Sequence, residues 1–163
     1  MSLIIKNLND LRDQYSILFC DVWGCVHNGI EVFESADLAL TAFRKSGGIV
    51  VLLTNAPRPA KAVKRQLDKI GLSDDSYDHI VTAGDAALEF IKKNNLGKKI
   101  YHMGPAKDIS FFETLFSTSG SYEFSLNPLQ KADFIVCTGL FNDQTETPEN
   151  YRSILTRAKA QKL

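Results

Sequence analysis

Short, continuous apolar runs alternate with stretches in which apolar residues recur at helical spacing. The runs at residues 16–20 and 49–54 are compact, which is typical of strands buried on both faces of a parallel sheet. Each run is followed by a predicted helix, the first capped by Ser35 and the second ended by Gly71. The apolar positions are Leu38, Ala39, Ala42 and Phe43 in the first helix and Ala60, Val63, Leu67 and Ile70 in the second.

This order of strand, helix, strand and helix predicts parallel strands joined by right-handed crossovers. Ligands of such sheets bind beyond the carboxyl ends of the strands. Asp21 directly follows the first run, and Thr54 and Asn55 stand at the end of the second. We therefore expect these polar residues at one edge of the sheet.

A second series of the same kind fills the rest of the chain. The pattern predicts strands at 80–81, 99–103 and 134–138, helices at 85–94 and 109–117, and a last helix that starts at Thr147-Pro148-Glu149. That start combines a cap, a proline at the first helical position and an acid in the first turn. The whole pattern predicts an α/β fold.

Composition and charge narrow the partners. The 163 residues carry 19 Lys and Arg against 19 Asp and Glu, so we expect no nucleic-acid partner and no anionic membrane surface. No apolar stretch is long enough to span a bilayer, and the amino terminus lacks a signal-peptide pattern. The three cysteines are an odd number, which indicates a reduced, cytoplasmic setting.

The strand ends offer phosphoryl chemistry. A carboxylate such as Asp21 can attack phosphorus as a covalent nucleophile, although a lone Asp-x-x-Gly is more often a turn. Thr54 and Asn55 bring a hydroxyl, an amide and backbone N–H groups that enter a helix, which suits a phosphate cradle. The same residues are also common in ordinary turns. On adjacent strands, the two signals together favour a phosphoryl site.

These residues resemble a known family. Asp21-Val-Trp-Gly-Cys-Val is similar to motif I of the haloacid dehalogenase-like (HAD) superfamily, and Leu53-Thr54-Asn55 to its motif II. The Thr-Asn-Ala-Pro-Arg form, followed by Val81-Thr-Ala-Gly-Asp-Ala86, resembles the class IIA branch, which includes NagD-like sugar and nucleotide phosphatases.

The resemblance implies a fold and a domain plan. The expected fold is a Rossmann-like parallel sheet core, incomplete here, with an inserted α/β cap domain. Residues 1–76 would be the first part of the core, residues 77–163 the cap, and the remainder of the core would be absent. We also expect the incomplete sheet to expose apolar surface and to favour homo-oligomers.

The resemblance also implies a mechanism. Asp21 would form an aspartyl-phosphate with a small phosphate ester, and water would then hydrolyse it. Mg²⁺ would bind the Asp21 carboxylate and the backbone carbonyl of Trp23. Thr54 and the N–H of Asn55 would hold the phosphate.

The chain departs from the family pattern at two places. The family's general acid/base is an aspartate two residues after the nucleophile, where this chain has Trp23. His27 is a nearby candidate for this role, although a loop histidine is more often simply solvated. The motif III lysine and motif IV acids have no counterpart after the expected cap, so we expect the 163 residues alone to be inactive.

Alternatives remain open at this point. Gly84-Asp85 with Glu89 can be motif IV of a capless phosphatase, with Lys61 or Lys64 as motif III. The protein can also be a phosphoryl-ligand binding or regulatory protein without efficient catalysis, because an indole cannot transfer the proton. A zinc site of Cys20, Cys25 and His27, or a cysteine nucleophile, has weaker support.

Overall fold

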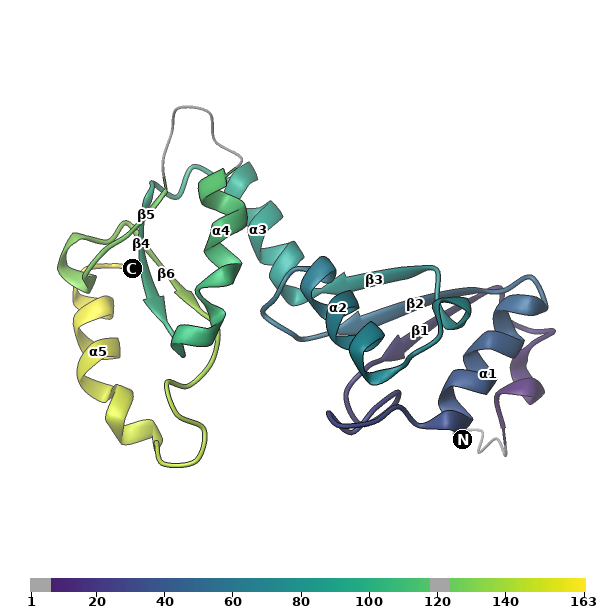
Figure 1. Cartoon of the computed structure of the whole chain (residues 1–163). Helices are drawn as coiled ribbons and strands as arrows, with labels where there is room; N and C mark the ends of the chain where they lie inside the picture. Colours follow the sequence, from purple (N-terminus) through teal and green to yellow (C-terminus); the bar gives the residue numbers. More distant parts are fainter. Residues whose placement is uncertain (1–6, 118–123) are drawn as a thin grey trace. The chain divides into compact units, whose positions relative to one another are not determined.

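A computed structural model describes residues 7–117 and 124–163 of the chain. The chain divides into two compact units, residues 1–86 and 87–163. Each unit contains a parallel sheet with helices (Figure 1). The predicted α/β fold with parallel sheets is therefore confirmed, and each unit is described by itself.

The first unit is built on a three-stranded parallel sheet in the order β1-β2-β3. Its strands are β1 (Ile17–Asp21), β2 (Ile49–Thr54) and β3 (His79–Thr82), and its helices are α1 (Glu34–Lys45) and α2 (Ala60–Ile70), with 3₁₀ helices η1 (Leu8–Leu11) and η2 (Asp74–Ser76). In the register of the sheet, Asp21 pairs with Leu53, and Thr54 pairs with Thr82. The polar ends of the strands therefore meet at one edge.

Helices α1 and α2 pack into the same hydrophobic core. This core joins Leu40 and Phe43 of α1, Val63 and Leu67 of α2, and Val50 and Leu52 of β2. Consecutive right-handed crossovers in one direction place both helices on the same face of a sheet, and the chain follows that rule.

The other side chains of the strands are open to solvent. Phe19 is 66% exposed, and Ile17, Leu53 and Val81 are also exposed. The sequence pattern predicted strands buried on both faces, and this exposure differs from that prediction. It agrees with the expectation that an incomplete sheet exposes apolar surface. The sequence pattern is apolar on this face, yet neither helix of the unit covers it.

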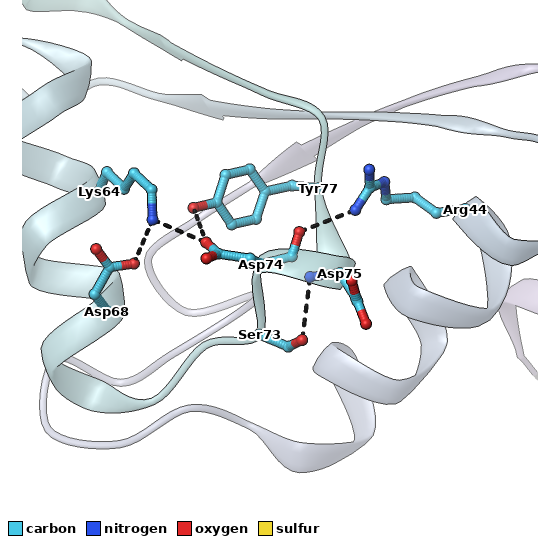
Figure 2. A network of polar contacts seen from close by, with 7 residues as sticks. All are labelled: Arg44, Lys64, Asp68, Ser73, Asp74, Asp75 and Tyr77. Atoms are coloured by element: carbon cyan, nitrogen blue, oxygen red, sulfur yellow. Dashed lines mark hydrogen bonds and ion pairs between the residues drawn. The ribbon is translucent and has the colours of Figure 1, made fainter.

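A polar network fixes the elements near the amino ends of the strands. Figure 2 shows Lys64 of α2 between the carboxylates of Asp68 and Asp74, with Nζ–O distances of 2.7 and 2.8 Å. The Arg44 guanidinium of α1 donates to the Asp74 carbonyl at 3.0 Å, and the Tyr77 hydroxyl donates to the Asp74 carboxylate at 3.4 Å. These exposed ion pairs are individually weak, but together they connect α1, α2 and η2.

Arg44 also pairs with Asp78, just before β3. The distance between its Nη2 and the Asp78 carboxylate is 2.8 Å, and the same carboxylate accepts a hydrogen bond from the buried Val50 N–H at 2.7 Å. This hydrogen bond, with the guanidinium beside it, lowers the pKa of Asp78. Asp78 therefore anchors the amino ends of β2 and β3, at the edge opposite Asp21 and Thr54.

The second unit carries a smaller parallel sheet in the order β5-β4-β6. Its elements are β4 (Lys99–Met103), β5 (Ser125–Leu126), β6 (Phe134–Cys137), α4 (Ser110–Ser117) and α5 (Pro148–Ala160), with 3₁₀ helices η3 (Ala106–Asp108) and η4 (Leu129–Lys131). Helix α3 (Ala83–Lys93) begins in the first unit and continues into the second. The predicted start of α5 is confirmed, since Thr147 precedes Pro148 and forms a capping box with Asn150 in the first turn.

Three expectations differ from the structure. Helix α1 begins at Glu34 after Phe33, without a side-chain cap, so Ser35 lies inside the helix. The strand predicted at 80–81, which was expected in the second domain, is β3, and it pairs with β2 in the first sheet. For that reason the chain divides after Ala86, whereas the sequence placed the boundary after residue 76.

Within the described ranges, the helices are too short or too polar to cross a membrane.

Candidate active site

The carboxyl ends of all three strands of the first sheet surround one cavity of about 580 Å³. The lining residues are Phe19, Asp21, Leu53, Thr54, Asn55, Val81, Thr82, Ala83 and Ala86. Asp21, Thr54 and Asn55, which the sequence predicted at one edge, therefore share a single cavity. Its polar groups are at the strand ends, and its apolar wall is the open face of the sheet.

Asp21 presents its carboxylate at the end of β1. The Val22 N–H donates to Asp21 Oδ1 at 2.8 Å, and the residue is exposed. The hydrogen bond to the next backbone N–H fixes the carboxylate at the strand end, while its exposure leaves it open to an electrophile. This is the geometry that a carboxylate nucleophile needs.

Thr54 is oriented by the loop that leads into α2. Its side chain is nearly buried, and its Oγ1 accepts a hydrogen bond from the Ala56 N–H at 3.2 Å. Within residues 7–117 and 124–163, the Thr54 hydroxyl accepts this bond and donates none. The hydroxyl is therefore able to donate to an oxygen in the cavity. Asn55, next to it, is exposed.

Thr82 occupies the matching position on β3, but its hydroxyl is engaged. It donates to Asp85 Oδ2 at 3.1 Å and accepts from the Asp85 N–H at 2.9 Å. A threonine hydroxyl has a single proton to donate, so the proton of Thr82 is used within the cavity wall. Sequence analysis missed Thr82, although it closes the third strand as Thr54 closes the second.

The loop after β1 folds over the same edge. The Gly24 N–H donates to the His27 carbonyl at 2.8 Å, and Gly24 has a φ of +82°, which favours glycine. The Trp23 side chain is 67% exposed. A second cavity of about 250 Å³ lies between this loop and the loop after β2; its lining includes Trp23, His27, Thr54, Asn55 and Arg58.

His27 is held in one protonation state. It is only 4% exposed, and its Nδ1 accepts a hydrogen bond from the Gly29 N–H at 2.8 Å. Burial lowers the pKa of the imidazole, because the charged form loses its hydration. His27 is thus a neutral ring with its proton on Nε2. A neutral imidazole donates a hydrogen bond but does not release that proton, so His27 is unsuited to replace the missing acid.

Cysteine chemistry has little support at this edge. Burial, with smaller contributions from Cys25 and Asp21, raises the pKa of the Cys20 thiol to about 11, so it stays protonated. Cys20, Cys25 and Cys137 are free thiols. The described residues contain no group of three His, Cys, Asp or Glu side chains placed to hold a metal ion, which argues against the zinc alternative.

The capless alternative also lacks its geometry. Asp85 is directed to α2: its Oδ2 accepts from the Ala60 N–H at 2.7 Å. Lys64 is paired with Asp68 and Asp74. In the described part of the chain, no group of three or more His, Cys, Asp or Glu side chains brings Asp21 and Asp85 together around a metal position.

The donor set at Asp21 suits a magnesium ion in part. The Asp21 carboxylate and the Trp23 carbonyl are hard oxygen ligands of the kind that Mg²⁺ prefers, and Mg²⁺ commonly combines one or two carboxylates with water and substrate phosphate. These two residues fit the ion as ligands.

Comparison with known proteins identifies the family. Residues 18–115 match the model of the haloacid dehalogenase-like hydrolase family. A haloacid dehalogenase-like hydrolase from Brucella suis 1330 is 36% identical, with a TM-score of 0.85 over 98% of this chain and 56% of that chain. The chain therefore belongs to the haloacid dehalogenase-like hydrolase family.

Two further solved structures show the same fold at lower identity. NagD from E. coli K-12 is 20% identical, with a TM-score of 0.55 over 90% of this chain and 52% of that one. A 4-nitrophenylphosphatase from Thermotoga maritima is 21% identical, with a TM-score of 0.58 over 93% of this chain and 52% of that one. The resemblance to the NagD-like class IIA branch is confirmed at the level of the fold.

The chain spans about half the length of these solved structures. Among curated proteins, no match was found.

Proposed function

We propose that the whole protein is a Mg²⁺-dependent phosphatase that hydrolyses a small phosphate ester through an aspartyl-phosphate on Asp21. The observation that carries the proposal is the meeting of Asp21 and Thr54 at one cavity, on adjacent parallel strands in register. Membership of the hydrolase family supports the proposal, as do the phosphatases among proteins of the same fold.

In this mechanism, Thr54 and the Asn55 N–H hold the phosphate while the free Asp21 oxygen attacks phosphorus. The bond from phosphorus to the ester oxygen breaks, and the leaving oxygen keeps the electron pair and takes a proton from water. Water then attacks the aspartyl-phosphate, which releases inorganic phosphate and restores the carboxylate. The Thr54 hydroxyl orients the phosphate by donating to one of its oxygens.

Asp21 and the Trp23 carbonyl would hold Mg²⁺. When bound, the ion would offset negative charge on the phosphoryl oxygens and so help a carboxylate to approach an anion.

The free cysteines support a reducing compartment, and we propose that the protein is cytoplasmic.

The test is Asp21→Asn in the whole protein, measured as Mg²⁺-dependent hydrolysis of p-nitrophenyl phosphate. We expect turnover to fall to background, because an amide is a poor nucleophile. Asp13→Asn is the matched control, since Asp13 is an exposed carboxylate at the other edge of the sheet. Unchanged turnover in Asp21→Asn would exclude the proposed mechanism.

A second function is favoured by Trp23. With an indole at the position of the family's acid and a neutral His27 beside it, the site is suited to hold a phosphoryl ligand while hydrolysing it poorly. In that case the protein binds inorganic phosphate through Thr54 and Asn55 but has little turnover. Measuring both phosphate binding and turnover of the same preparation separates the two functions.

A further inference from the structure

The start of α3 contacts the loop that carries the proposed phosphate donors. The Gly84 N–H donates to the Ala56 carbonyl at 3.1 Å, and Asp85 accepts from the Ala60 N–H at 2.7 Å. Residues 56 and 60 bracket the loop between Thr54-Asn55 and α2. Segment 82–85 therefore holds this loop at both of its ends.

Asp85 supplies the cap that α2 lacks in its own sequence. The residue before α2 is Pro59, which provides no side-chain hydrogen bond to the helix. The first N–H groups of a helix have no partner within the helix, and a carboxylate there also interacts favourably with the helix dipole. Asp85 fills this position from 25 residues away, so the sequence of α2 alone does not reveal it.

Gly84 allows the two backbones to meet. A Cβ on Gly84 would lie 2.7 Å from both the Pro57 and the Arg58 carbonyl oxygens. Real Cβ atoms do not approach backbone oxygens so closely, so any side chain at this position would push the loop away. The absence of a side chain at Gly84 is thus a condition for the observed loop position.

Thr82 connects the contact between segment 82–85 and the loop of residues 55–59 to the cavity. Its side chain is 1% exposed, and it pairs with Thr54 in the register of the sheet. Among the described residues, its hydroxyl forms hydrogen bonds only with Asp85. The carboxylate that caps α2 is therefore fixed, through Thr82, to the strand next to the one that carries Thr54.

We infer that Asp85 is a positioning residue: through the Ala60 N–H it holds the loop of residues 55–59 so that Thr54 and the Asn55 N–H point at the phosphate. The inference rests on the proposed function. It assigns Asp85 no contact with substrate and no role in metal binding. Its effect is on phosphate affinity, which depends on the donor geometry.

The decisive variant is Ala60→Pro in the whole protein. It removes only the backbone N–H that donates to the Asp85 carboxylate, and proline is favoured at the first position of a helix. Pro59 already has the extended backbone (φ −58°, ψ 150°) that a residue before proline adopts, so the variant is expected to fold. Asp85→Ala removes the acceptor instead, and Asp85→Asn keeps an oxygen that can accept the bond. Glu89→Gln, an exposed carboxylate on the same helix, is the control.

The readouts are the inhibition constant of inorganic phosphate, KM and kcat for p-nitrophenyl phosphate, and the melting temperature. We expect Ala60→Pro and Asp85→Ala to raise the phosphate inhibition constant and KM by about tenfold, a change that corresponds to about 1.4 kcal/mol of binding. Asp85→Asn should recover part of the affinity, and Glu89→Gln should match the unmodified protein. A loss of stability alone would lower the melting temperature without this change in phosphate affinity.

Thr54→Ala separates the inference from the proposed function. If Thr54→Ala weakens phosphate binding while Ala60→Pro and Asp85→Ala stay within twofold of the unmodified protein, the positioning role is wrong and the proposed function stands. If the unmodified protein neither binds inorganic phosphate nor hydrolyses the aryl ester, the proposed function fails and the inference fails with it.

Discussion

The backbone N–H of Gly29 donates a hydrogen bond to Nδ1 of His27 at 2.8 Å. A ring nitrogen that accepts a hydrogen bond carries no proton, so the imidazole proton is on Nε2. The ring is also buried, which lowers its pKa. His27 is therefore a structural acceptor beside the smaller cavity, and protonating its Nδ1 would break the bond to Gly29.

This arrangement predicts a pH dependence of stability. In the unfolded chain a histidine has a pKa of about 6.5, and in the folded chain the pKa of His27 is lower. The unfolded state thus binds more protons, so the free energy of unfolding should fall as the pH drops below about 6.5. Urea unfolding at pH 7.5 and 5.5, followed by Trp23 fluorescence, measures this change, because Trp23 is the single tryptophan of the chain.

His27→Gln should remove much of that pH dependence. His102→Gln is the control, because His102 also has a pKa lowered by burial but belongs to the second unit, whereas Trp23 belongs to the first. An unfolding free energy that does not change between the two pH values would contradict the neutral state of His27.

The identity of residue 23 predicts how turnover depends on the leaving group. Without a side-chain acid there, esters whose leaving group departs as a stable anion should react far faster than alkyl esters. Trp23→Asp should raise kcat for an alkyl phosphate by about 10²–10⁴, the usual contribution of a positioned acid, and should change p-nitrophenyl phosphate much less. Trp23→Asn is the matched control without a transferable proton, and an equal effect of both substitutions would refute the explanation.

Gly84→Ala should destabilise the first unit. Its new Cβ would meet two backbone carbonyl oxygens at 2.7 Å, and overpacking of this kind costs about 1–3 kcal/mol. Gly71→Ala provides the comparison, because Gly71 has a φ of +88° but a Cβ added there would meet no atom within 4 Å. Both should lower the urea midpoint, and only Gly84→Ala should also weaken phosphate inhibition.

Asp78→Ala should destabilise the same unit without affecting the site. The substitution leaves the buried Val50 N–H without its acceptor, and an unpaired buried donor costs about 1–3 kcal/mol. Since Asp78 is at the amino edge of the sheet, the inhibition constant of phosphate should be unchanged. A large loss of phosphate affinity at unchanged stability would show that the two edges are coupled.

Acid should weaken the interactions of the Asp78 carboxylate with the Val50 N–H and Arg44. The Val50 N–H and Arg44 lower the pKa of Asp78, so this carboxylate contributes stability above the unfolded pKa of about 3.9 and loses that contribution as the pH falls through its lower folded value. The difference in unfolding free energy between the unmodified protein and Asp78→Ala should therefore shrink at the acidic end of the titration.

Much of the first unit is predictable from sequence because local signals and tertiary structure agree there. The run at 49–54 and the helix ended by Gly71 match β2 and α2, and Asp21, Thr54 and Asn55 do line one cavity. Parallel topology explains this success, since it sends every strand's carboxyl end to one edge.

The remaining features depend on contacts between distant residues. Asp85 stands at the start of the predicted helix 85–94, and its bond to the Ala60 N–H follows only from the pairing of β2 with β3. That pairing also placed β3 in the first unit. The two-residue strand β5 is too short for any periodicity to show, and the burial of His27 depends on how the loop after β1 folds back.

The open face of the first sheet has a consequence for topology. The crossovers through α1 and α2 both advance from β1 toward β3, and in the described residues β1 pairs on one side only, with β2. A right-handed connection that added a strand at the free edge of β1 would run in the reverse direction and so place its helix over Phe19, Leu53 and Val81. The direction of winding would then reverse at β1, and crevices at such reversals are where open α/β sheets bind their ligands. Asp21, at the carboxyl end of β1, would stand at that point of reversal.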